Sequence, residues 1–294
     1  MALPALHALS ACGLRLRIVS PRGWVSDLLA GHDWPVTRLP SGLRAAPAAL
    51  RAAQGPRHGL LLTNSFSSAW AFRAAGIRAL GFEGDGRSLL LARALSRPQQ
   101  GLHEARVFWQ LAEQALRWLG GEAWPAEMPS SLGLETSAAH REAATQALVR
   151  ADLSERPYAV LAPFAAGQIR GQDKRWPGFG ELAPLLRAQG LTTAVCPGPG
   201  EADQVNAVVP GAVLLPGLGL GAYAAVCKVA RVTVANDSGP MHLACAVDAP
   251  VVGVFGPGDP ARTGPWGERA CALGGKGAWP TVAEVLEAAL RVSA

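Results

Sequence analysis

A run of polar residues directly after a β-branched segment has the composition of an anion site. Val232 to Ala235 is followed by Asn236-Asp237-Ser238-Gly239, and a helix is expected from about Pro240, with His242 in its first turn. The serine or the aspartate suits the helix cap, the proline suits the first position, and the glycine allows close backbone approach. Free amides at a helix start favour a diphosphate, to which the histidine can donate. The same residues also fit a well-capped buried helix with a histidine in the core.

Two further loops follow predicted strands in the same half of the chain. Residues 162–177 end in Lys-Arg-Trp-Pro, where Lys174 can place a point charge on a phosphate. Residues 196–201 place Glu201 shortly after two glycines, where nucleotide-binding folds often hold ribose hydroxyls. Each loop alone also fits an exposed turn. Together, an anion site, a lysine and a carboxylate at three successive strand ends predict a nucleotide cleft.

The elements that position these residues alternate between strand and helix, as a doubly wound α/β fold requires. In the second half, strands are expected at residues 158–162, 192–196, 213–215, 232–235 and 251–255, and helices at 137–149, 179–189, 223–229, 241–246 and 282–292. In the first half, strands are expected at 16–20 and 59–63, and helices at 2–12, 25–30, 44–54, 69–75, 88–95 and 104–119. The aperiodic, Gly- and Pro-containing stretch 120–134 is interpreted as a linker. We therefore expect two domains, 1–130 and 131–294.

Composition narrows the class of protein. Apolar residues make up 49% of the chain and charged residues 17%, which is enough to fill two cores. The net charge is +5, but the arginines are dispersed, so we expect no nucleic acid and instead a phosphate-bearing ligand or an anionic membrane surface. The five cysteines lie far apart and are interpreted as small buried hydrophobes of a reducing compartment. Leu9 to Cys12 resembles a lipoprotein cleavage box, but no basic residue precedes it, so we expect a cytoplasmic protein and not an exported one. The net positive charge leaves peripheral contact with the cytoplasmic face of the inner membrane open.

The stretch from Asn236 to Gly267 resembles the signature of glycosyltransferase family 9, the heptosyltransferases of lipopolysaccharide core synthesis. The resemblance lies in Asn-Asp-Ser-Gly-x-Met-His-x-Ala-x-Ala and in the later Phe-Gly-Pro-x-Asp-Pro-x-Arg. The Lys-Arg-Trp-Pro run at 174–177 and the Gly-x-x-Glu turn at 198–201 precede this signature along the chain, in the same order as in the family. Upstream, residues 63–66 and 81–90 resemble parts of its acceptor domain, so the resemblance covers nearly the whole chain.

The resemblance implies a GT-B-like α/β fold of two facing, Rossmann-like doubly wound domains. It implies an ADP-sugar donor and inverting transfer of a heptose-like sugar, without metal or cofactor, to a cell-envelope glycan or glycolipid. Lys174 would hold donor phosphate, Glu201 would hold the ribose, and Lys174 and His242 would be the catalytic residues. The remaining candidate donor-binding residues are Asp237, Ser238, Gly239, Pro240 and Met241. The candidate acceptor-side residues are Asn64, Ser65, Asp85 and Arg87.

The resemblance is incomplete at the amino end. In the family, Met1 to Leu6 corresponds to a point inside the first helix, after a first strand, a Gly-rich loop and an aspartate regarded as the general base. We therefore expect the natural protein to begin upstream of Met1, with the base in that upstream segment. A degenerate relative that binds a nucleotide sugar without turnover is the alternative function, because sites without their base lose rate but can retain binding.

Overall fold

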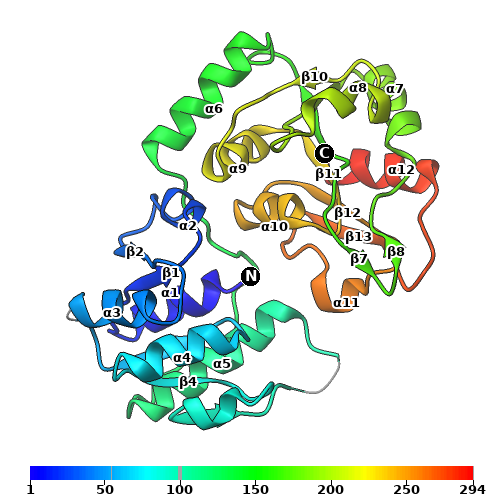
Figure 1. The fold of residues 1–294 in the computed structure, drawn as a ribbon. Coiled ribbons are helices and arrows are strands. Elements are labelled where there is room, and N and C mark those ends of the chain that lie inside the picture. The colour runs from blue at the N-terminus through cyan, green and yellow to red at the C-terminus, as the bar shows by residue number, and fades with distance from the viewer. Residues whose placement is uncertain (54, 99–100, 294) are drawn as a thin grey trace. The chain divides into compact units, whose positions relative to one another are not determined.

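The chain forms two compact units. The computed structural model describes residues 1–53, 55–98 and 101–293. One unit, here unit 1, comprises Met1–Ser26 with Asp33–Met128, and the other, unit 2, comprises Asp27–His32 with Pro129–Ala294 (Figure 1). The sequence placed residues 27–32 in the first domain. They pack with unit 2 instead, because Asp27 pairs with His140 at 3.3 Å and His32 accepts the Glu135 amide at 3.2 Å.

Unit 2 is built on one parallel sheet with the order β10-β9-β6-β11-β12-β13. Its strands are β6 (Tyr158–Ala162), β9 (Thr192–Val195), β10 (Val213–Leu214), β11 (Val232–Asn236), β12 (Val251–Phe255) and β13 (Ala270–Gly274). Its helices are α6 (Ala138–Arg150), α7 (Phe179–Ala188), α8 (Val205–Val208), α9 (Leu220–Val229), α10 (Gly239–Ala246), α11 (Pro260–Thr263) and α12 (Val282–Ser293), with a 3-10 turn at Ala202–Gln204. A hairpin, β7 (Gln168–Ile169) and β8 (Gln172–Asp173), stands outside the sheet.

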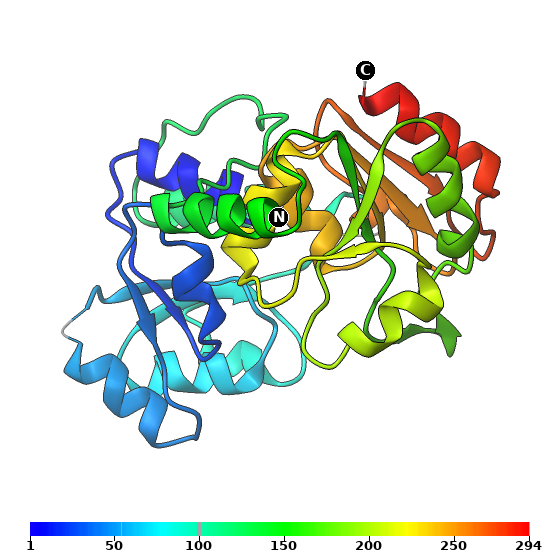
Figure 2. The same cartoon turned by 90° about the horizontal axis from the view of Figure 1, so that it is seen from above.

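Helices cover both faces of this sheet. Val252 and Val254 of β12 join the core beneath α7 and α12. Gly253 between them faces the other side, where an added Cβ would lie 2.6 Å from the sulfur of Met241 in α10. Figure 2 shows the strands between α12, in red, and α10, in orange. Strands buried on both faces are continuous apolar runs, which is why the sequence identified them readily.

The described residues of unit 1 form two separate parallel sheets. One pairs β1 (Ile18–Ser20) with β2 (Val36–Arg38), and the other has the order β3-β4-β5. The second sheet consists of β3 (His58–Leu61), β4 (Arg78–Phe82) and β5 (Arg93–Leu95). The helices are α1 (Leu3–Ala11), α2 (Trp24–Leu28, which runs into the unit 2 segment), α3 (Ala45–Ala52), α4 (Phe66–Ala74) and α5 (Glu104–Trp118), with a 3-10 turn at Arg87–Leu90. The strand–helix alternation predicted for this half is present, but the sheet is interrupted.

The helix predicted at residues 88–95 is wrong. A 3-10 turn ends at Leu90, and β5 follows and pairs in parallel with β4. Leu89 and Leu90 belong to the 3-10 turn, and the pairing with β4 begins after them, where the Ala92 amide donates to the Ala79 carbonyl at 2.8 Å. Strands β2, β4 and β13 and the β7–β8 hairpin were not predicted. In the part of the chain that the structure describes, no helix is long and apolar enough to cross a membrane.

The cysteines divide into two groups. Cys227 and Cys245 are buried, and burial raises the pKa of Cys227 to about 11 and that of Cys245 to about 12. Both therefore stay neutral thiols and pack as small hydrophobic side chains, as predicted. Cys12, Cys196 and Cys271 are only half-buried, so the prediction of burial is wrong for these three.

Candidate donor-binding site

The strand order of unit 2 reverses direction at β6. From β6 the chain passes to β9 and β10 on one side, and then returns to β11 on the other side. In open α/β sheets, ligands bind outside the carboxyl ends of the strands at such a switch point. The loop after β6 carries Lys174 and the loop after β11 carries Asp237 and Ser238. The predicted polar residues therefore come from the two adjacent strand ends where this rule places a ligand.

Asn236, the last residue of β11, ties these two loops together. Its side chain is completely buried, and its amide donates to the Pro163 carbonyl at 2.7 Å. Its oxygen accepts the Trp176 amide at 2.9 Å. One side chain thus holds both ends of the loop that carries Lys174, and a buried amide with its hydrogen bonds satisfied is a rigid anchor. The motif contains Asn236, but nothing in the sequence signals this role.

Lys174 and Asp237 meet at the switch point. The Lys174 Nζ lies 3.4 Å from Asp237 Oδ2, and the two side chains are 18% and 11% exposed. Gly258 makes room for this carboxylate, because a Cβ there would lie 2.9 Å from Asp237 Oδ2. An ammonium has three donors, so Lys174 can contact an incoming phosphate while it keeps the carboxylate. This contact also explains how an acidic side chain is accommodated beside a predicted anion site.

The neighbouring Arg175 is committed to a different partner. It binds Asp173 through Nε at 2.8 and 3.0 Å, which lowers the pKa of Asp173 to about 2. Asp173 ends β8, and Lys174 follows it directly. The two adjacent cations therefore have different partners. Arg175 binds Asp173 within the same hairpin, whereas Lys174 reaches Asp237 at the end of β11. The sequence alone fits either residue in contact with a phosphate, and the structure favours Lys174.

The start of α10 presents backbone amides at the same edge of the sheet. Ser238 is the N-cap residue, but its hydroxyl donates to the Asn236 carbonyl at 3.1 Å rather than accepting from the helix. Gly239 is exposed and His242, in the first turn, is half-buried. Helix amides at such a terminus favour an anion. Met241, by contrast, is completely buried, so only its backbone can serve a ligand and its side chain belongs to the core.

Glu201 lies at the carboxyl end of β9, the strand beside β6. Its Oε2 accepts the Gly198 amide at 2.7 Å, which closes the turn that the sequence identified by its glycines. The carboxylate therefore has a fixed position at the same sheet edge as Lys174. All three predicted strand-end groups belong to the adjacent strands β9, β6 and β11.

The acceptor-side candidates in unit 1 form a tight loop cluster. Ser65 caps α4 by accepting the Ser68 amide at 3.2 Å, and Asn64 Oδ1 accepts from Arg87 at 2.9 Å. Arg87 is only 1% exposed and also donates to the Thr63 and Phe82 carbonyls. The prediction that Arg87 faces an acceptor does not fit this burial, because its guanidinium donates hydrogen bonds to three oxygens inside unit 1.

Asp85 is another of these candidates, and like Asn64 it is exposed. It has a left-handed backbone, with φ of 48°, between two glycines that also have positive φ. Such a conformation is uncommon for residues with a side chain and is often found in functional loops. Asp85 therefore stays a candidate for contact with an acceptor.

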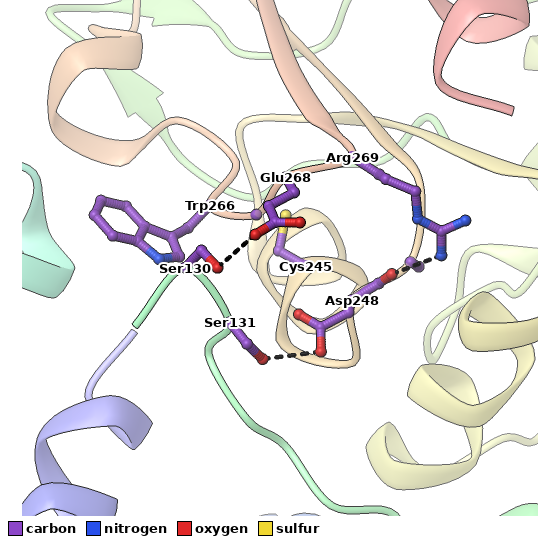
Figure 3. Close-up of a pocket in the computed structure, with 9 residues that line it drawn as sticks. Ser130, Ser131, Cys245, Asp248, Trp266, Glu268 and Arg269 are labelled. Atoms are coloured by element: carbon purple, nitrogen blue, oxygen red, sulfur yellow. Dashed lines mark hydrogen bonds between the residues drawn. The ribbon is translucent and has the colours of Figure 1, made fainter. Parts of the chain in front are cut away.

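A pocket of about 340 Å³ lies at the opposite edge of the unit 2 sheet. Asp248 and Arg269 line it, and they come just before β12 and β13, at the amino ends of these strands. Ser130 donates to Glu268 at 3.0 Å and Ser131 donates to Asp248 at 2.8 Å, as Figure 3 shows. These bonds fasten the linker to unit 2. The pocket therefore shares no residue with the loops at the carboxyl ends of the strands.

No metal site was predicted. Across residues 1–53, 55–98 and 101–293, no group of three or more His, Cys, Asp or Glu side chains is arranged to hold a metal ion.

Comparison with known sequences gives the site a family. The sequence model of glycosyltransferase family 9 (heptosyltransferase) matches residues 50–286. The chain belongs to this family. The matched span includes every predicted donor-binding residue, from Lys174 to His242, and all four acceptor-side candidates. The family suggested by the motif after β11 is therefore confirmed.

This glycosyltransferase family 9 chain is similar to one curated relative in sequence and to two solved structures in fold. Lipopolysaccharide heptosyltransferase 1 of Pseudomonas aeruginosa is 36% identical over 107 residues, which are 34% of this chain and 30% of the relative. The match thus spans about a third of that relative's length. The solved ADP-heptose lps heptosyltransferase II of E. coli has a TM-score of 0.77 at 22% identity and covers 99% of this chain and 94% of its own. A family 9 glycosyltransferase from Veillonella parvula has a TM-score of 0.83 at 16% identity, with coverage of 99% and 92%. The predicted GT-B-like α/β fold with Rossmann-like domains is confirmed.

Proposed function

We propose that this protein is an inverting, metal-independent glycosyltransferase that moves a heptose-like sugar from an ADP-sugar to a cell-envelope glycan or glycolipid. Membership of the heptosyltransferase family and the ADP-heptose donor named for the E. coli relative support this proposal. The acceptor is of the lipopolysaccharide core type, as the name of the P. aeruginosa relative suggests. A net charge of +5 suits a protein that meets an anionic glycolipid at the cytoplasmic face of the inner membrane.

The observation that carries the proposal is the Lys174–Asp237 pair at 3.4 Å, next to the start of α10, at the point where the strand order reverses. In the reaction, an acceptor hydroxyl attacks the anomeric carbon from the face opposite the diphosphate. The bond between that carbon and the phosphate oxygen breaks, its electrons stay on ADP, and the acceptor proton passes to a base. Inversion follows from this single displacement.

The residues of unit 2 serve the departing ADP in this scheme. Lys174, His242 and the α10 amides stabilise the negative charge that grows on the diphosphate, which is the role other enzymes give to a divalent ion. Glu201 accepts hydrogen bonds from the ribose hydroxyls, and Asp237 accepts them from the sugar. Pro240 fixes the first turn of α10 without adding an amide of its own.

Nucleotide selectivity and metal independence can be measured in one set of titrations. Isothermal calorimetry with ADP, UDP and GDP, each with and without EDTA, should give the tightest binding for ADP by at least about tenfold, which corresponds to roughly 1.4 kcal/mol. Chelation should leave the ADP affinity unchanged, because protein cations and amides neutralise the diphosphate. Tighter binding of UDP would overturn the donor assignment. Loss of ADP binding in EDTA would overturn metal independence.

A further inference from the structure

The exposed large apolar side chains of unit 1 gather in the segments that follow its strands. Five of them form what we call the apolar patch: Trp24 after β1, Leu43 after β2, Phe66 and Trp70 in α4 after β3, and Leu89 after β4. Their counterparts in unit 2 are scattered over α6, α7, α9 and β10. A concentration of exposed apolar residues on one side of a protein often marks an interaction surface.

Contacts between the loops hold the apolar patch together. The Trp70 indole Nε1 donates to the Leu43 carbonyl at 3.0 Å, which joins the loop after β2 to α4. Phe66 and Trp70 are four residues apart in α4 and therefore lie on the same face of this helix. The 3-10 turn that carries Leu89 packs against α4, and Leu89 itself is 90% exposed. Trp24 follows β1, which pairs in parallel with β2, so its loop is next to that of Leu43.

Exposed arginines accompany the apolar patch. Arg22, Arg38 and Arg44 lie at the ends of β1 and β2 and at the start of α3, in or beside the same loops. A Cβ at Gly23 would lie 3.5 Å from the Arg38 Cζ, so this guanidinium is beside the backbone that leads into Trp24. Among the described residues, none of these three arginines forms an ion pair with a carboxylate. They are therefore available to an anionic partner.

The charge of the chain is divided unequally between the two units. In unit 1 the arginines far outnumber the aspartates and glutamates, whereas unit 2 has slightly more acidic than basic residues. The net charge of +5 therefore arises entirely in unit 1. An anionic surface attracts this unit and not the unit that carries the donor loops.

Tryptophan, phenylalanine and leucine beside arginine are the side chains that settle at the interface of an anionic bilayer. The patch is spread over several loops with arginines beside them, which suits a fluid surface that takes up each side chain singly. A protein partner would instead need pockets for its anchors. We propose that this edge of unit 1 binds an anionic phospholipid surface, with the apolar patch among the headgroups and Arg22, Arg38 and Arg44 on the phosphates.

The inference deepens the proposed function and rests on it for one point, the use of a glycolipid acceptor. The acceptor-side candidates Asn64 and Asp85 lie in the same loops as Phe66 and Leu89. A membrane-bound acceptor would therefore reach these candidates from the bilayer. Binding to lipid can be measured without donor or acceptor, so its failure and a failure of the proposed transfer are separate observations.

Vesicle sedimentation tests the proposal. The protein should bind phosphatidylcholine vesicles that contain phosphatidylglycerol about a hundredfold more tightly than phosphatidylcholine alone, since each arginine at an anionic surface contributes roughly fivefold. High salt should remove most of this preference. Changing Arg22, Arg38 and Arg44 together to glutamine should also abolish most of it. The matched control changes three exposed arginines at the amino ends of β3, β4 and β5 and should bind like the parent: Arg57→Gln, Arg73→Gln and Arg93→Gln.

The apolar contribution has its own matched pair. Leu43→Ser with Leu89→Ser should weaken vesicle binding by about tenfold or more, because two exposed leucines no longer enter the interface. Val149→Ser with Val229→Ser removes two exposed apolar residues from unit 2 and should leave vesicle binding unchanged. Melting curves and ADP affinity should stay at the parent values in both double variants, because all four side chains are exposed.

Three results would overturn the proposal. The first is equal or absent binding of the parent protein to the two kinds of vesicle. The second is an equal loss of vesicle binding in a variant and its matched control. The third is a dimer, formed without lipid and lost in Leu43→Ser with Leu89→Ser, together with no vesicle binding by the parent, which would assign the patch to a second copy of the chain.

Discussion

Lys174→Ala should weaken ADP binding roughly ten- to a hundredfold and leave thermal unfolding almost unchanged. A charge-assisted contact in a cleft contributes about 1.5–3 kcal/mol, which converts to that change in affinity. Lys174 is partly exposed at the end of a hairpin, so its removal leaves no cavity in the core. The variant also leaves Asp237 facing the diphosphate without its cation, which places the expected loss near the upper end of the range.

A second lysine of unit 2 gives the matched control. Lys228 lies exposed in the last turn of α9, and Lys228→Ala removes the same charge from the same unit. ADP affinity should stay at the parent value in this variant.

His242→Ala should weaken ADP binding as Lys174→Ala does, because the imidazole is in the first turn of α10. Calorimetry and melting curves on the same samples distinguish a loss of ADP affinity from a loss of stability. Unchanged affinity with a lowered melting temperature in Lys174→Ala would mean that the lysine only stabilises the loop.

Arg87→Ala should destabilise unit 1 strongly and leave ADP binding unaffected. Arg87 is almost fully buried and serves Thr63, Asn64 and Phe82. A hydrogen bond from a charged donor contributes about 1.5–3 kcal/mol, and Arg87 donates to three neutral oxygens, so the unfolding temperature should fall by about 10 °C or more. The donor loops belong to unit 2 and do not depend on this network.

The exposed Arg73, in the last turn of α4, is the control for charge. Arg73→Ala should shift unfolding by no more than about 1–2 °C, as surface substitutions usually do. Circular dichroism melts of both variants, with ADP titrations, give the comparison. Normal stability in Arg87→Ala with a loss of acceptor use alone would restore the acceptor role that the sequence suggested and contradict the structural role assigned here.

The sequence predicted unit 2 better than unit 1, for a physical reason. Strands buried on both faces, such as β6 and β12, are unbroken apolar runs and are identifiable without tertiary information. Strands β1 and β2 have three residues each and are half-buried, so their pattern is weak. Strand β5 was mistaken for helix because leucine suits both, and pairing with β4 decided the outcome.

The candidate site shows the same limits. Lys174 and Asp237 could be placed after strands of one parallel sheet from the alternation alone. That these strands are neighbours, with the two side chains 3.4 Å apart, follows only from the structure. The hairpin that carries Lys174 could not be predicted, because its turn puts Arg170 and Gly171 at φ of 52° and 77°. Such turns usually have asparagine or aspartate where this one has arginine. The burial of Arg87 depends on partners from two other loops, which no local pattern reveals.

Hydrogen–deuterium exchange with and without saturating ADP tests the location of the donor site most directly. The switch-point assignment predicts slower exchange in residues 163–176, 196–201 and 236–242, which lie at the carboxyl ends of β6, β9 and β11. It predicts unchanged exchange in residues 129–134 and 266–269, at the amino ends of β12 and β13. Protection at the amino-end pocket, with unchanged exchange around Lys174 and Ser238, would contradict the assignment.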